Sequence, residues 1–315
     1  MVSKLTRTNF AELLTPVHRK VFFDTYNKKD KQYTSIFKVD DMHAKQETFP
    51  HLGAFGKWEE NTEGSDFRQA DITMGDIATF TAKRYDKAYE VTWELVQDDL
   101  YNTLKGNGRG GSASKLGSGL QATEESQAAG VINGGFTTNG YDGVPLFSDS
   151  HPLASSSNTV SNLIVGGLTD ETLKAALTKM RLQTDEAGVL VAAHADRLVV
   201  HPDWEFTARA LIDSTLRAGT NNNDKNTLPG LDVIVWDYLY DAAGNIKPWF
   251  VQDSSMDNLM FLWREKPIFD SEKIENKMDY RFYGYCRFDT GYVDWRGLCG
   301  SNGVTTAGTT ESSAA

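Results

Sequence analysis

Long apolar runs are missing from this chain of 315 residues. The longest, Leu190–Ala193, Leu198–Val200 and Val233–Trp236, fall far short of the roughly 20 apolar residues that span a bilayer. Residues 1–4 lead into polar sequence without the apolar region of a signal peptide. We therefore expect no membrane contact and a protein that stays in the cytoplasm where it is made.

Cysteine is scarce, because the chain has only Cys286 and Cys299. A disulfide between them is possible in principle, but a chain without an export signal normally sits in reducing cytoplasm. We expect two free thiols at buried or half-buried positions.

Clusters of positive charge are also missing. The formal net charge is −11, and the densest basic stretch, Lys28-Lys29-Asp30-Lys31, carries its own carboxylate. Tight binding to a phosphate backbone needs clustered lysine and arginine. The composition therefore disfavours a high-affinity reader of nucleic acid and suits a container better than a binder.

Cofactor and metal motifs are hard to find. Residues 106–111, Gly-Asn-Gly-Arg-Gly-Gly, formally fit G-x-G-x-x-G, but that motif needs a strand before it and a helix after it. Residues 98–105 look helical instead. The six histidines include no H-x-x-x-H pair, and neither cysteine has a C-x-x-C partner. We expect no cofactor-binding residues and no metal ligands.

Catalytic groups are equally sparse. Residues 148–151, Ser-Asp-Ser-His, contain the residue types of a triad, but adjacent residues rarely converge. We interpret them as an Asx or Ser turn before Pro152. Acidic doublets such as Glu124-Glu125 are expected on solvated surface, because sequence neighbours do not face each other on a helix. We expect no catalytic residues, although an acid–base pair from distant positions stays open.

Residues 1–45 are predicted to form an arm. Thr8 can cap a short helix that Pro16 interrupts, and the helix resumes over Val17–Tyr26. A segment of this kind cannot build a core by itself, so we expect it to dock on something else.

Residues 46–97 are predicted to form an extended hairpin. From Tyr89 to Leu95, apolar and polar residues alternate with the period of two that is typical of a half-buried strand. Ile77–Thr81 suggests another strand, and a glycine-rich acidic tip is expected near Glu59–Asp66. Because a two-stranded hairpin is marginal in water, its stability should come from contacts beyond it.

The remaining residues are predicted to be mixed helix and sheet. Residues 98–135 should form one long, imperfect helix or two in series, with a Gly/Ser-rich interruption over 106–119. Residues 136–255 carry a helix capped by Thr169, a helix opened by Pro202, and short buried strands. Residues 256–300 end in alternating strands, and the tail from Ser301 to Ala315 is predicted to be disordered.

Five segments in order carry a family resemblance: Tyr89–Asp99, a strand running into an acidic helix start; Tyr141–Pro152, with an Asp-Gly…Phe…His-Pro pattern; Arg197–Ser214, a strand–Pro–helix unit; the strand Leu231–Leu239; and the closing pair Tyr280–Gly284 and Val293–Gly297. Together they resemble the major capsid proteins of tailed bacteriophages, and among these the Mu-like major head subunits. The resemblance covers about residues 60 to 300.

This resemblance implies the α+β Hong Kong 97-type fold. Its parts would be an N-terminal arm (1–45), an extended β-hairpin loop (46–97), a peripheral domain with a long spine helix (98–135) and closing strands (256–300), and an axial domain (136–255). The independent prediction of an arm, a long hairpin and a long helix in that order agrees with it.

The resemblance also implies a structural protein and not an enzyme. Subunits would form hexamers and pentamers through heterologous contacts, building an icosahedral shell around a double-stranded DNA genome. The implied partners are the chain itself, a portal protein, an optional decoration or cement protein, and packaged DNA without sequence readout. A separate scaffolding protein is expected because the chain begins directly in the arm, unless the sequence is already a processed form.

Inter-subunit contacts are expected from two places. The extended hairpin contributes Trp58, Glu59, Glu60, Glu63, Asp66, Arg68, Lys83, Arg84 and Lys87, and the arm contributes Phe10, Leu13, Leu14 and Phe22. The acidic tip needs a basic partner patch, for which Arg68, Lys83, Arg84 and Lys87 are the candidates. The part around Trp58–Lys87 should reach across, while Tyr89–Leu95 should be anchored on its own subunit. The alternatives are a tail-tube or decoration protein and, from another class, an α/β hydrolase.

Overall fold

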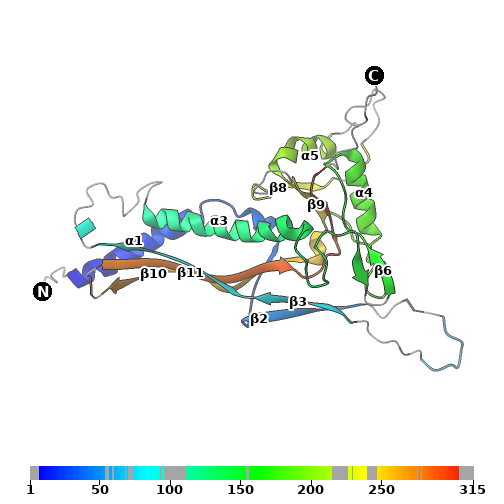
Figure 1. Cartoon of the computed structure of the whole chain (residues 1–315), viewed down its shortest axis with the longest axis horizontal. Coiled ribbons are helices and arrows are strands. Elements are labelled where there is room, and N and C mark those ends of the chain that lie inside the picture. Colours follow the sequence, from blue (N-terminus) through cyan, green and yellow to red (C-terminus); the bar gives the residue numbers. More distant parts are fainter. Residues whose placement is uncertain are drawn as a thin grey trace, which may run out of the picture.

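The computed structural model describes residues 7–53, 57–58, 60–67, 69, 74–92, 94–95, 111–153, 156–214, 226–228, 230–239, 247–274, 276–277 and 279–304. The chain has the outline of an L, with a long part and an upright part (Figure 1). A hairpin passes beneath the upright part and extends beyond it. Helices and sheets both contribute to each part, as the sequence predicts.

The long part is built on a four-stranded sheet. Its strands, in spatial order, are β1 (Lys38–Asp41), β10 (Leu259–Ile274), β11 (Asp279–Tyr292) and β4 (Lys83–Val91). β1 runs parallel to β10, and the other neighbours are antiparallel. Alternate residues of β11, from Tyr280 to Phe288, are buried, which confirms the period-two prediction. Gly284 falls in this buried row and leaves a gap in it.

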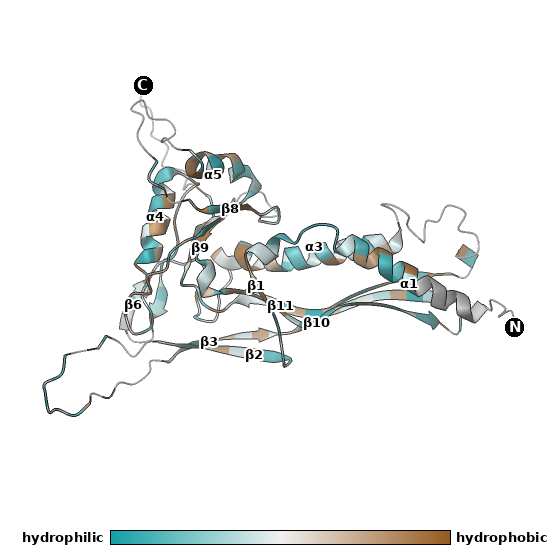
Figure 2. Cartoon of the chain, turned by 180° about the vertical axis from the view of Figure 1, so that it is seen from behind, coloured by the Kyte–Doolittle hydropathy of each residue, from teal (hydrophilic) through white to brown (hydrophobic). Residues whose placement is uncertain are grey.

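Two helices cover one face of this sheet: α1 (Arg7–Tyr26) and α3 (Ser112–Asn133). Figure 2 shows hydrophilic and hydrophobic residues mixed along both, as expected of helices with one buried face. The predicted break at Pro16 is wrong, since α1 runs through it. Pro16 is exposed, so water can satisfy the carbonyl that loses its amide partner. The later turns are fixed by a buried stripe of His18, Phe22 and Tyr26.

The Gly/Ser-rich interruption predicted over residues 106–119 is also wrong for its second half. α3 begins at Ser112 and includes Gly117 and Gly119. A Cβ on Gly117 would lie 2.5 Å from the backbone oxygen of Phe22. Glycine therefore serves close packing of α3 against α1 at this position, and the lost helix propensity is offset by tertiary contact.

The upright part holds a second four-stranded sheet, with the order β12 (Leu298–Ser301), β9 (Trp249–Gln252), β7 (Arg197–Val200) and β8 (Asp232–Val235). α4 (Asp170–Arg181) and α5 (Glu205–Ile212) pack around it. The predicted cap is confirmed, because the Thr169 hydroxyl accepts from the Thr172 amide in a capping box. The tail was predicted to start too early: Ser301 is fully buried in β12, and residues 305–315 lie outside the description.

Two small sheets complete the described fold. The hairpin pairs β2 (Gln46–Leu52) with β3 (Met74–Thr81), and β5 (His151–Leu153) pairs with β6 (Ser156–Val160). The strand predicted over Tyr89–Leu95 is β4, which ends at Val91 and belongs to the long sheet. Trp93 lies outside the description. The extended hairpin is therefore β2–β3 alone.

One hydrophobic core joins the two parts. The long sheet contributes Phe261 and Phe288, α3 contributes Ile132, and the upright part contributes Trp236 and Phe250. Because these side chains form one buried cluster, the two parts are held together by continuous packing.

Two carboxylates lie inside this assembly, although the sequence predicted them on the surface. Glu124 and Glu125 of α3 are 0% and 2% exposed. Glu124 accepts from the Tyr26 hydroxyl at 2.6 Å, the Lys31 ammonium at 2.8 Å and the Tyr33 hydroxyl at 3.1 Å. Burial first, and then the Glu124 charge, raise the pKa of both tyrosines.

Glu125 connects three segments. It accepts from the backbone amide of Gln32 at 2.6 Å, from that of Tyr33 at 3.2 Å, and from the indole of Trp236 at 3.0 Å. Burial raises the pKa of Glu125 above its ordinary value, while these hydrogen bonds oppose the shift. The arm segment, α3 and the upright part therefore meet at one side chain.

Candidate assembly surfaces

Among the described residues, the most exposed aromatic side chains lie at the far end of the β2–β3 hairpin. Trp58 is 98% exposed and Phe67 is 99% exposed. A tight turn separates them, with the Ser65 amide donating to the Thr62 carbonyl at 3.1 Å and Gly64 at φ +84°. The Asn61 side chain donates to the Asp66 carbonyl at 2.8 Å. We call residues 57–58 and 60–67 the tip segment.

Acidic groups surround these two aromatics. Glu60, Glu63 and Asp66 are exposed on the tip segment, with Lys57 as the one cation among its described residues. The predicted contact residues Glu59 and Arg68 lie outside the description. The sequence prediction did not name Phe67, although a lone phenylalanine within a polar, glycine-rich stretch was a visible signal.

The base of the hairpin, by contrast, belongs to the core of its own chain. Phe80 of β3 is 3% exposed and packs with Met42 and Leu262. The Phe49 and Phe80 rings meet edge to face, with centroids 5.4 Å apart. The hairpin is thus anchored at one end, while its tip segment extends beyond the upright part (Figure 1).

The predicted basic residues of this region lie on β4, an edge strand of the long sheet. Lys83 pairs with Asp289 at 3.1 Å, and Arg84 pairs with Asp86 at 2.9 Å while stacking on the Tyr285 ring. All three predicted cations, Lys83, Arg84 and Lys87, are exposed. Since β4 pairs with β11 along its whole length, they do not project with the hairpin as predicted.

The arm residues fall into two groups. Phe10, Leu13 and Leu14 lie in α1, where the description is limited to the backbone. Phe22 is fully buried and stacks on Phe269 with centroids 5.0 Å apart. Its side chain therefore packs within its own chain, which corrects its prediction as a contact to another subunit.

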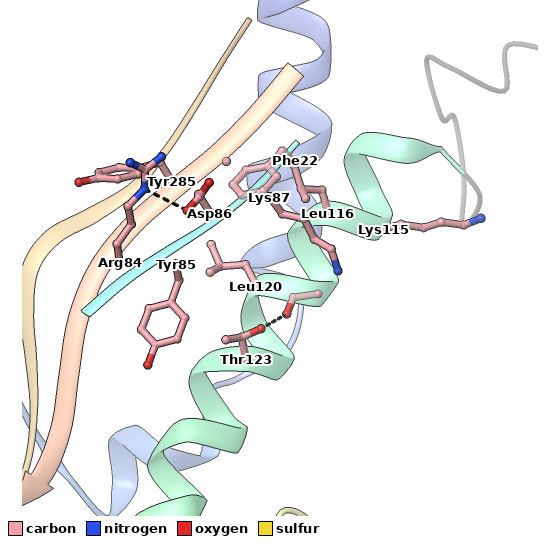
Figure 3. A pocket seen from close by; sticks show the side chains of 12 residues that line it. Phe22, Arg84, Tyr85, Asp86, Lys87, Lys115, Leu116, Leu120, Thr123 and Tyr285 are labelled. Atoms are coloured by element: carbon pink, nitrogen blue, oxygen red, sulfur yellow. Dashed lines mark hydrogen bonds and ion pairs between the residues drawn. The ribbon is translucent and has the colours of Figure 1, made fainter. Parts of the chain in front are cut away.

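A pocket opens between α3 and β4 (Figure 3). Its volume is about 370 Å³. Phe22, Tyr85, Leu116 and Leu120 supply apolar walls, and Gly284 also lines the pocket. The prediction from sequence did not find this pocket, because it depends on which residues of β4 and α3 face each other.

The Ser-Asp-Ser-His stretch builds a turn in which Ser148 and His151 are buried and Asp149 and Ser150 are exposed. The Ser148 hydroxyl accepts from the Ser150 amide at 3.2 Å, as the turn prediction requires. His151 lies 2.6 Å from Asp142 and 3.1 Å from the Asn162 side-chain oxygen, and it stacks on Trp295. Because its two ring nitrogens face Asp142 and Asn162, the imidazole is positioned for packing and not beside a nucleophile.

The described residues contain no group of three or more His, Cys, Asp or Glu that could hold a metal ion. In the same part of the chain, no helix is both long enough and apolar enough to cross a membrane.

A family model described as phage capsid protein matches residues 76–301. The chain belongs to this family. The prediction of a capsid protein, located in the virion, is confirmed, and the alternatives of a tail-tube protein and a hydrolase are not supported. As a capsid protein, the chain works by associating with copies of itself. The narrower Mu-like assignment stays a prediction.

Solved structures show the same fold. The capsid of the cyanophage P-SCSP1u matches with a TM-score of 0.58 and 11% identity, covering 88% of this chain and 89% of that chain. The capsid of a native GTA particle matches with a TM-score of 0.53 and 13% identity, covering 87% and 90%. The mature capsid of bacteriophage PhiM1 gives 0.53 and 10%, covering 84% of both chains. No curated protein matches this capsid protein.

Proposed function

We propose that this capsid protein is the major head subunit of a tailed bacteriophage and assembles into hexamers and pentamers of an icosahedral shell. In this proposal the shell encloses double-stranded DNA, and the subunit has no enzymatic role. Family membership and the shared fold support it. The portal, a separate scaffolding protein and an optional decoration protein remain the proposed additional partners.

The observation that carries the proposal is the tip segment. Two aromatic side chains, Trp58 and Phe67, are almost completely exposed at the end of an anchored hairpin. Trp is enriched among the residues that dominate binding energy at interfaces, and a free monomer gains nothing from exposing such rings. The tip segment is therefore proposed as the contact that reaches a neighbouring subunit.

Each part of the chain can then be assigned a position within a ring of subunits. We assign the long part, with α3 as spine helix, to the periphery of each ring, and the upright part to its axis. The boundaries at residues 45, 97, 135, 255 and 300 remain those predicted. The burial of Phe22 supports an arm that is anchored on its own subunit before it reaches further.

Electron microscopy of the purified protein tests this proposal. Shells, or regular hexamers and pentamers, are the expected result. Replacing residues 57–67 by a short Gly-Ser connection should leave a folded subunit that no longer forms shells. A wild-type protein that stays monomeric at all concentrations and with co-expressed phage head proteins would contradict the proposal.

A further inference from the structure

The tip segment needs a receptor surface, and three hollows among the described residues are candidates for it. One lies between α3 and β4, a second is lined by Phe80, Gly130 and Tyr292, and a third lies along α4. From their chemistry, we infer that the α3–β4 pocket receives an aromatic side chain of the tip segment from a second copy of this chain. The inference rests on the proposed function and names the receiving site.

The apolar content of the α3–β4 pocket fits an aromatic ring. Tyr85 and Leu120 are half-buried and line it together with Leu116 (Figure 3). A Cβ on Gly284 would lie 3.5 Å from Leu116 and 3.7 Å from Phe22, which is ordinary van der Waals distance. Gly284 therefore leaves room for about one methyl group between the sheet and these two side chains, and the larger space is the pocket of about 370 Å³ itself. Burying an aromatic ring in that pocket would remove apolar area from water on both partners.

The charge at the rim fits the tip segment as well. Arg84, Lys87 and Lys115 line the α3–β4 pocket with one carboxylate, Asp86, which pairs with Arg84. In the part of the chain that the structure describes, the side-chain ammonium groups of Lys87 and Lys115 have no hydrogen bond or ion pair, and both residues are exposed. Both ammonium groups are thus available for carboxylates of an incoming segment.

The tip segment supplies those carboxylates beside its rings. Glu60 follows Trp58 by two residues, and Asp66 directly precedes Phe67. An aromatic ring entering the pocket would therefore bring a carboxylate to its rim. Opposite charges arranged around a central apolar contact give an interface both orientation and specificity.

The other two hollows fit less well. The lining of the hollow beside Phe80 has no lysine or arginine, and its one carboxylate, Asp289, already pairs with Lys83, so it offers no cation to an acidic segment. The hollow along α4 contains Lys174 and Lys179, but Lys174 already pairs with Asp170, and Lys179 donates to the Leu163 carbonyl at 2.8 Å. Of the three hollows, the α3–β4 pocket is therefore the one whose charged side chains best complement the acidic tip segment.

Photo-crosslinking on assembled shells tests the inference. Benzoylphenylalanine replaces Trp58 in one preparation and Phe67 in another, and the linked peptides are identified by mass spectrometry. We expect inter-subunit links from at least one position to residues 84–87 or 115–123, in shells and not in free subunits. Shells whose links from both positions map elsewhere, for example to residues 130–138, would overturn the inference and leave the proposed function intact.

A matched pair of substitutions on α3 distinguishes a blocked pocket from a general defect in folding. Gly119 lines the pocket and Gly130 does not, and a Cβ at either would have no atom within 4 Å. Gly119→Phe should abolish the links, while Gly130→Phe should leave them unchanged. Equal links in both variants would contradict the assignment. If no shells form from the wild-type chain, the proposed function and this contact between copies fail together.

Charge reversal provides a second readout. Lys87→Glu with Lys115→Glu should lower the yield of shells roughly tenfold or more, since the contact repeats around the shell. Adding Glu60→Lys and Asp66→Lys to the same chain should restore the yield. An unchanged yield after the first pair, or a lowered yield that the second pair does not restore, would overturn the electrostatic part of the inference.

Discussion

Gly117 of α3 lies so close to Phe22 of α1 that a single added carbon would sit 2.5 Å from the Phe22 carbonyl oxygen. This contact fixes the spacing of the two helices over the long sheet. It also brings the Phe22 ring into the cluster on which Leu116 packs, and both side chains line the pocket.

The first prediction concerns this helix contact. Gly117→Ala should lower the free energy of unfolding by about 1–3 kcal/mol, because the helices must separate or distort. Gly119→Ala is the matched control two residues away, exposed and without a neighbour within 4 Å. It should raise stability by about 0.5–1 kcal/mol through helix propensity. Urea denaturation measures both, and equal effects would refute the close contact.

The second prediction concerns Glu125 and pH. All its described partners are N–H donors, so Glu125→Gln would turn an amide nitrogen toward a donor. The variant should lose about 1–3 kcal/mol at neutral pH. The exposed Glu60→Gln is the control and should change stability by less than about 0.5 kcal/mol.

The pH dependence of this difference has a definite sign. Because burial raises the pKa of Glu125, the folded protein holds this proton more tightly than the unfolded chain does. The titration of Glu125 therefore contributes stability below the unfolded value of about 4.5 and loses it as pH rises through the folded pKa. As pH rises from the unfolded pKa to the folded pKa of Glu125, the difference in unfolding free energy between the wild type and Glu125→Gln should shrink. A difference that stays constant with pH would contradict the raised pKa of Glu125.

The third prediction concerns the thiols. Burial raises the pKa of Cys286 and of Cys299 to about 12 each, and both side chains are fully buried. The thiolate is the form that attacks the disulfide of Ellman's reagent, so neither cysteine should react at pH 8 in the native protein. Both should react in guanidinium chloride. Rapid reaction of either thiol under native conditions would show that the core around it opens.

The fourth prediction separates folding from assembly at the tip segment. Trp58→Ser and Phe67→Ser remove side chains that are almost fully exposed. The free energy of unfolding should change by less than about 0.5 kcal/mol, while shell formation should fall sharply. Thermal denaturation and electron microscopy of the same samples check the two halves, and a large loss of stability would place these rings in the core.

Sequence patterns correctly predicted the features that depend on neighbouring residues in the chain. The alternation from Tyr280 to Phe288 gave a correct strand, and Thr169 gave a correct helix cap. The order of arm, hairpin and long helix was also predictable. The resemblance of five short segments was enough to predict the capsid protein family correctly.

The features that the sequence did not predict depend on contacts between residues far apart in the chain. Glu124 and Glu125 are buried because donors arrive from residues roughly 90 to 110 positions away, which no local pattern shows. Gly117 appeared to break a helix because its packing partner lies on α1. The receptor pocket depends in the same way on β4 facing α3, so charge in the sequence pointed to Arg84 and Lys87 but not to Lys115.

The long pairing of β10 with β11 has a mechanical consequence. The two strands run antiparallel from the core shared with the upright part to the distal end beneath α1. Tension applied lengthwise would load their hydrogen bonds in shear, so many bonds would share the force at once. Tension applied across the sheet would instead open them one after another from an end. The long sheet therefore resists tension along β10 and β11 better than tension across them.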